Sequence, residues 1–134
     1  MHILLTVEPQ IDLVNQRRWL QGVVRSLIIQ VMAGEAAQFG LPLHDLSFLG
    51  DDLPALLGVL ATVDEYVSVS NTNIHLLAGI GTTARVLVPY PAEWRWLRRE
   101  GRSPWFPDFP VYRQTASRDW RTALKQLREE LRLV

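Results

Sequence analysis

The chain has 134 residues, 14 Lys plus Arg against 14 Asp plus Glu, 48% hydrophobic residues and no cysteine, which is the composition of one ordinary globular domain. The lack of cysteine excludes disulfides, thiolate metal sites and a cysteine nucleophile. No apolar run approaches the ~20 residues of a membrane span, and the residues before Glu8 lack the basic start of a signal peptide, so we expect a cytoplasmic protein.

Formal charge is divided along the chain. Residues 1–84 carry three basic and eight acidic residues, a net −5, whereas residues 85–134 carry eleven basic and six acidic residues, a net +5. Clustered arginines bind phosphate well, but solvated helix faces and internal ion pairs explain the same pattern. Nucleic-acid binding is the least favoured function, because no recognised motif accompanies the basic residues.

The first half of the chain predicts strands that alternate with helices. Predicted in order are a strand at Ile3–Val7, a helix at Ile11–Val24, a buried strand at Arg25–Gln30, a short helix at Gly34–Phe39 closed by Gly40, and a loop or short edge strand at Leu41–Asp45. Asp51 or Asp52 then caps a helix that has Pro54 in its first turn.

The second half continues the alternation. Predicted in order are a strand at Tyr66–Ser70, a short helix opened by Asn71–Asn73 and closed by Gly79 and Gly81, a strand at Arg85–Val88, a Trp/Pro-rich loop at 89–114 with one helical turn at Glu93–Arg99, and a helix at about 117–131 capped by Ser117. This order predicts an α/β fold: a single Rossmann-like domain over 1–134, three-layered and doubly wound, with a mostly parallel sheet and helices on both faces.

One strand-to-helix junction is a candidate anion site. In parallel α/β sheets ligands bind beyond the carboxyl ends of the strands, and free amide hydrogens at a helix start attract phosphate. The same small polar residues are also simply good helix caps. The candidate diphosphate-binding residues are Ser70, Asn71, Thr72, Asn73 and His75.

The run from Leu53 to Gln114 resembles a known family, and Ile28–Asp45 does so more weakly. The resemblance is carried by four pieces: the helix leading into Asp64–Val69, the turn and helix Asn71–Leu76, the strand Arg85–Pro89, and the spaced signatures Glu93–Trp96, Ser103–Pro107 and Val111–Gln114. The chain is similar to the C-terminal half of bacterial glycosyltransferase-like proteins. These often follow tetratricopeptide repeats and are similar to heptosyltransferases and O-linked N-acetylglucosamine transferases.

The resemblance implies one half of a fold-B glycosyltransferase, which binds a nucleotide-sugar donor without a metal and places its pyrophosphate at Asn71–His75. The family has an aspartate before that helix, where this chain has Ser70. The acceptor half and its catalytic base are not expected within this length, so transfer would need a partner domain. Glu93, Asp108, His44 and His75 can titrate, but none has a neighbour in sequence that indicates a dyad or triad, and no catalytic residue is assigned.

The Trp/Pro-rich loop supports a second hypothesis. Trp94 and Trp96 flank Arg95, and such rings and guanidinium planes stack on sugars or bases, although rings in a long loop also pack to hold it in place. Arg113 could equally be a structural partner of Asp108 or Asp119. Exposed rings would favour a non-enzymatic module that docks or self-associates through this loop. Buried rings beside a basic pocket at Asn71–His75 would favour nucleotide-sugar binding.

Overall fold

The computed structural model describes residues 3–6, 37, 40, 44–98 and 102–131. The chain divides into two compact units, one formed by Met1–Thr6 and Leu57–Val134 and the other by Val7–Leu56. The predicted helix at Ile11–Val24 and the predicted strand at Arg25–Gln30 lie outside the described residues.

In the Val7–Leu56 unit, Gly40 adopts a positive φ of 63° and its N–H donates to the carbonyl of Ala37 at 3.1 Å. A positive φ agrees with the predicted role of Gly40, and the predicted helix at Gly34–Phe39 lies outside the described residues except for Ala37. His44 and Asp45 form no regular structure, and a 3-10 helix, η1, follows at Ser47–Asp51.

Helix α2 (Leu53–Leu60) begins where the sequence places its cap. The Oδ1 atom of Asp52 accepts a hydrogen bond from the Ala55 N–H at 3.0 Å, which identifies Asp52 rather than Asp51 as the capping residue. Pro54 lies in the first turn, where its missing N–H removes no helical hydrogen bond. The last residue, Leu60, is buried.

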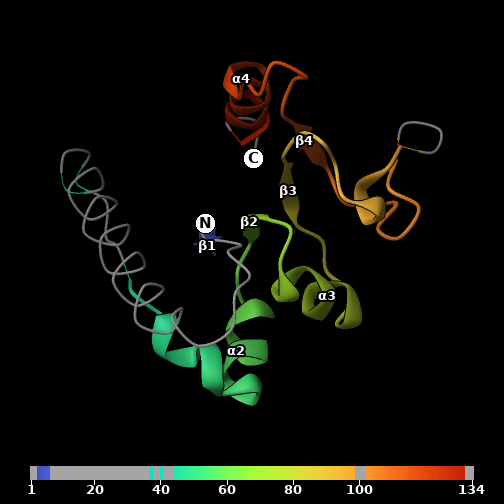
Figure 1. Ribbon diagram of the computed structural model, residues 1–134. Coiled ribbons are helices and arrows are strands. Elements are labelled where there is room, and N and C mark those ends of the chain that lie inside the picture. Colours follow the sequence, from blue (N-terminus) through green and yellow to red (C-terminus); the bar gives the residue numbers. More distant parts are fainter. Residues whose placement is uncertain (1–2, 7–36, 38–39, 41–43, 99–101, 132–134) are drawn as a thin grey trace, which may run out of the picture. The chain divides into compact units, whose positions relative to one another are not determined.

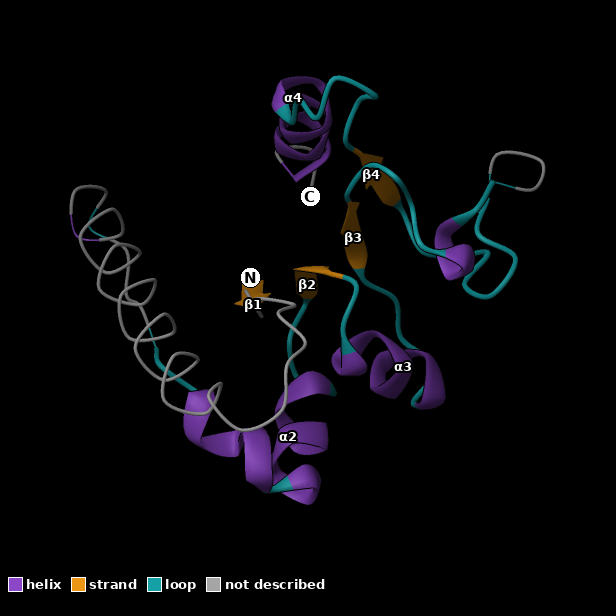
Figure 2. Ribbon diagram, viewed as in Figure 1, coloured by secondary structure: helices purple, strands orange, loops and turns teal. Residues whose placement is uncertain are grey.

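Four parallel strands form one sheet in the order β1-β2-β3-β4 (Figures 1 and 2). They are β1 (Ile3–Thr6), β2 (Glu65–Val69), β3 (Arg85–Val88) and β4 (Val111–Arg113). The predicted strand at Arg85–Val88 is confirmed at both ends, and that at Tyr66–Ser70 is confirmed with both ends shifted by one residue. The strand predicted at Ile3–Val7 is confirmed over Ile3–Thr6, and Val7 lies outside the described residues. The chain therefore has an α/β fold with a parallel sheet.

The strand order contains no reversal among the described strands, each of which pairs with the next one along the chain. Doubly wound sheets reverse their order at the switch point where they bind ligands. The described strands therefore include no such switch point. They also leave β4 at one edge of the sheet.

Two helices contact the sheet through strand side chains that point to opposite faces. Val67 and Tyr112 pack with Ala123 and Leu127 of helix α4 (Arg121–Leu131). Because successive side chains in a strand point to opposite faces, Tyr66 faces away from α4. Its hydroxyl accepts a hydrogen bond at 2.8 Å from a side chain of helix α3 (Thr72–Gly79).

The start of α4 differs from the prediction. The helix is confirmed up to Leu131, beyond which the residues are not described, but it begins at Arg121, so Ser117 is not its cap. Arg118 has a positive φ of 60°, and its N–H donates to the carbonyl of Thr115 at 2.9 Å. This turn breaks the helix, and the Oδ1 atom of Asp119 accepts the Arg121 N–H at 2.8 Å instead.

A charged cluster ties three strands to α4. The guanidinium of Arg85 on β3 makes two hydrogen bonds to Glu65 of β2, at 3.0 and 3.1 Å, and one to Glu130 of α4 at 3.0 Å. It also donates to the hydroxyl of Tyr112 on β4 at 2.7 Å, and that hydroxyl donates to Glu130. The bonds to Glu65 raise the pKa of Arg85, and the bond from Tyr112 lowers the pKa of Glu130.

Replacing Arg85 by Met is expected to lower the free energy of unfolding by about 3 kcal/mol, because Glu65 would stay partly buried without its counter-charge. Urea denaturation followed by circular dichroism measures this loss. The control is Arg121→Met, whose side chain is 92% exposed in its pair with Asp119 and whose removal should lower the stability far less, because solvent screens an exposed pair. Equal losses in the two variants would contradict a structural role for the cluster.

Tyr112 should give the protein a distinctive alkaline stability profile. Burial, aided by the bond to Glu130, raises the pKa of Tyr112 to about 12 from a reference of 10.0. A group with a raised folded-state pKa stabilises the fold below its unfolded pKa, and this contribution is lost between pH 10 and 12, by about 2–3 kcal/mol. Tyr112→Phe should flatten the profile over this interval when unfolding is measured at each pH. Parallel profiles for the two proteins would refute the assignment.

Candidate functional site

The junction of β2 and α3 has the geometry expected of a helix start that follows a strand. Asn71 occupies the N-cap position with extended backbone, φ −152°, but its side chain makes no capping bond to α3. Its Nδ2 atom instead donates to the Oγ atom of Ser68 at 2.8 Å. Asn71 therefore takes the N-cap position of the helix that Asn71–Asn73 was predicted to open, but the first amides of α3 have no side-chain cap.

The five predicted diphosphate-binding residues lie on one stretch but point in different directions. Ser70 and Asn73 are buried, and the Nδ2 atom of Asn73 donates to the hydroxyl of Tyr66 at 2.8 Å, inside the fold. Thr72 and His75 are exposed. The sequence locates the junction, but it does not reveal that Asn73 faces the core.

His75 also contacts the Trp/Pro-rich loop. Its ring meets the edge of Phe106 at a centroid distance of 5.2 Å. Phe106 in turn stacks on Trp96 at 5.1 Å and tilts against Phe109 at 5.2 Å. This row of rings joins α3 to the loop, so His75 has a packing role whether or not it binds a ligand.

The loop separates its tryptophans into buried and exposed rings. Trp96 lies in a 3-10 turn, η2 (Trp94–Trp96), shorter than the turn predicted at Glu93–Arg99, and is fully buried. Trp94 and Trp105 are 53% and 60% exposed and meet edge to face at 5.0 Å. Packing therefore explains Trp96, whereas Trp94 and Trp105 present apolar surface to solvent.

Arg95 is held by its neighbours in the loop. Its guanidinium lies 4.6 Å from the centroid of the Trp94 ring and pairs with Glu93 at 3.2 Å. Its carbonyl accepts a hydrogen bond at 2.7 Å from the Oγ atom of buried Ser103. Sequence reasoning did not single out Ser103, although a serine before a proline is a turn signal.

Ser103 organises the second half of the loop as well. Its Oγ atom accepts the N–H groups of Trp105 at 3.2 Å and Phe106 at 3.0 Å. One hydroxyl thus holds the main chain at both Trp105, whose ring is exposed, and Phe106, whose ring is buried. The described parts of the loop between β3 and β4, residues 89–98 and 102–110, are consequently joined by hydrogen bonds through Ser103.

Arg113 forms an ion pair with neither Asp108 nor Asp119. Asp119 pairs instead with Arg121, two residues further along at the start of α4, with 2.6 Å between its Oδ2 atom and the Nη2 atom of Arg121. Asp108 is exposed and makes no ion pair with any described residue. The Nη2 atom of Arg113 is buried and has no hydrogen-bond partner.

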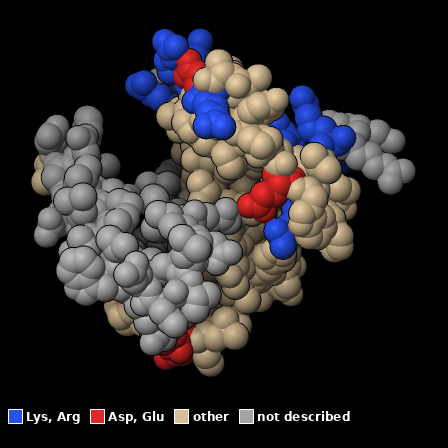
Figure 3. Space-filling view, viewed as in Figure 1, with Lys and Arg blue, Asp and Glu red and all other residues tan. Residues whose placement is uncertain are grey.

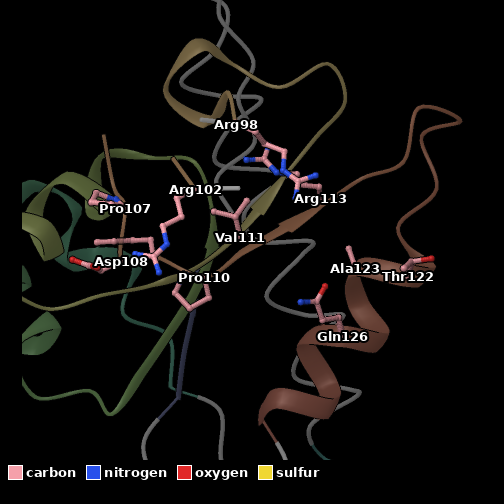
Figure 4. A pocket seen from close by; sticks show the side chains of 11 residues that line it. Arg98, Arg102, Pro107, Asp108, Pro110, Val111, Arg113, Thr122, Ala123 and Gln126 are labelled. Carbon is pink, nitrogen blue, oxygen red and sulfur yellow. The ribbon is translucent and has the colours of Figure 1, made fainter. Parts of the chain in front are cut away.

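Arg113 lines a cavity that the sequence did not predict. The cavity has a volume of about 630 Å³ and lies between the loop after β3, strand β4 and helix α4 (Figure 4). Arg98, Arg102 and Asp108 line it from the loop, and Thr122 and Gln126 line it from α4. The only sequence signal was the positive charge of residues 85–134.

Neither a protein-family model, nor a curated protein, nor a solved structure matches the chain. Within the described residues, no group of three or more His, Cys, Asp or Glu side chains is placed to hold a metal ion. No helix in the part of the chain that the structure covers is both long and apolar enough to cross a membrane.

Proposed function

We propose that this chain is a three-layer, Rossmann-like domain that binds the diphosphate group of a nucleotide sugar at the start of α3. The observation that carries the proposal is that α3 follows the carboxyl end of a parallel strand and has no side-chain cap. Amide hydrogens and the positive end of the helix dipole at such a position attract phosphate oxygens.

The residue directions refine this proposal. Because Asn73 bonds to Tyr66, the phosphate contacts fall to backbone amides and to the exposed side chain of Thr72. His75, one turn further and also exposed, would contribute a ring nitrogen only from its position against Phe106.

The resemblance to fold-B glycosyltransferases extends the proposal to a role. In this role the domain binds the donor without a metal, and sugar transfer takes place only when an acceptor-binding domain, in another chain or a further copy, completes the site. No catalytic residue is assigned to this domain.

Thr72→Glu is expected to abolish nucleotide-diphosphate binding while preserving the fold. A carboxylate at the first helical position repels phosphate, but it suits the helix dipole and therefore does not destabilise α3. The measurement is calorimetric titration with the diphosphates of uridine, guanosine, cytidine and adenosine.

Thr83→Glu is the matched control, because Thr83 is equally exposed but follows the opposite end of α3. This variant should bind the nucleotide as the unmodified chain does. The proposal fails if no diphosphate binds the folded protein, or if Thr72→Glu leaves the affinity unchanged.

A second function, self-association through the Trp/Pro-rich loop, is favoured by the exposed pair Trp94 and Trp105. Leu97, at 55% exposure, adds apolar surface in the same loop. Solvent-exposed aromatic rings held in a fixed arrangement are typical of protein interfaces.

Under this hypothesis, sedimentation velocity should show a concentration-dependent dimer that Trp94→Ser combined with Trp105→Ser returns to monomer. Leu124→Ser provides the control, since Leu124 is 49% exposed on α4 and should leave the dimer intact. A chain that stays monomeric at all concentrations would exclude self-association.

A further inference from the structure

The cavity beside β4 gathers positive charge that the described residues do not neutralise. Among the described residues that line it, Arg98, Arg102 and Arg113 stand against one acidic residue, Asp108, so the described lining has a net charge of +2. No described carboxylate forms an ion pair with any of the three arginines. Figure 3 shows basic side chains gathered near α4 and near the loop.

Arg98 and Arg113 lie next to each other in the cavity (Figure 4). Burial lowers the pKa of Arg113, and the positive charge of Arg98 lowers it further. The Nη2 atom of Arg113 is buried without an acceptor. Two guanidinium groups in this arrangement repel each other, and an anion between them would relieve the repulsion and satisfy the buried nitrogen.

The remaining lining indicates what the anion carries. Thr122 and Gln126 stand across the cavity on α4 and offer neutral donors. Pro107, Pro110 and Val111 supply an apolar wall. The volume of about 630 Å³ falls within the ~300–1,000 Å³ of small-molecule sites, so the cavity holds more than an isolated ion.

We propose that this cavity binds the phosphoryl group of a small organic phosphate ester, with the phosphate between the guanidinium groups of Arg98 and Arg113 and the organic part against the apolar wall. A phosphate dianion matches the net charge of the lining, and guanidinium groups bind its oxygens in pairs. This site is separate from the start of α3 and does not depend on the function proposed there.

The test is calorimetric titration of the full chain with inorganic phosphate and with phenyl phosphate at low ionic strength. Because phosphate also suits the start of α3, the titrations are made in the Thr72→Glu background. Both probes should bind saturably, and phenyl phosphate should bind at least about threefold more tightly, because its ring removes apolar surface from water. Equal affinities would overturn the ester assignment in favour of a free anion.

Arg113→Gln and Arg98→Gln should each weaken binding of both probes by about tenfold or more, the usual effect of losing a charge-assisted hydrogen bond. Arg113 makes no hydrogen bond through Nη2, and Arg98 is exposed, so both variants should fold, which their thermal unfolding checks. Arg128→Gln removes the same charge from an exposed position of α4 outside the cavity and should change affinity less than about twofold.

The proposal is overturned if neither probe binds saturably to the folded chain. It is equally overturned if Arg128→Gln weakens binding as much as Arg113→Gln does, because binding would then reflect the general charge of the C-terminal region. A single-stranded oligonucleotide that competes with phenyl phosphate far more strongly than inorganic phosphate does would replace the small ester by a nucleic-acid backbone.

Discussion

The guanidinium of Arg85 is the constraint on which the arrangement of the C-terminal region depends. It donates hydrogen bonds to Glu65 on one neighbouring strand, Tyr112 on the other and Glu130 on α4. It therefore joins elements that are far apart in the sequence. A single arginine satisfies all of them because its five donors project in a fixed plane. The position of α4 against β4 follows from this cluster and from the packing of Tyr112 with Ala123 and Leu127.

The same cluster extends to the cavity. Glu130 accepts a hydrogen bond from the Nε2 atom of Gln126 at 3.0 Å, and Gln126 lines the cavity opposite Arg113. The structural ion pairs thus extend to one wall of the proposed phosphate site, while Arg113 itself has no carboxylate partner among the described residues. Arg85 on β3 therefore stabilises the fold through its ion pairs, whereas Arg113 on the adjacent strand β4 is the arginine proposed to bind the ligand.

Elements with strong local signals were predictable from the sequence. The strand at Arg85–Val88 and the aspartate cap of α2 depend on local alternation and local hydrogen bonding, so the bounds of the strand and the start of the helix agree with the structure. The start of α4 was not predictable, because Ser117 and Asp119 are equally plausible caps in sequence. The choice depends on the left-handed backbone of Arg118, and arginine carries no signal for that conformation.

The candidate sites show the same limit more strongly. The residues of the β2–α3 junction are close together in sequence, so the junction itself could be located from the strand-to-helix pattern. The direction of the Asn73 side chain toward Tyr66 depends on the fold and could not be predicted. Arg98, Arg102 and Arg113 belong to a loop and to a strand, and they meet with Thr122 and Gln126 only because α4 returns against β4. The spacing of these residues along the chain does not predict that they line one cavity. The excess of positive charge over residues 85–134 was the sequence signal that pointed to this region.

The edge position of β4 among the described strands has a consequence for association. An open edge of a parallel sheet offers unpaired N–H and C=O groups to any extended segment, including the same edge of a second molecule. Here the edge is only three residues long and is flanked by the arginines of the cavity. Two such edges brought together would also bring the cavity arginines of both molecules closer, and the repulsion between their guanidinium groups would oppose a continuous ladder between the two sheets.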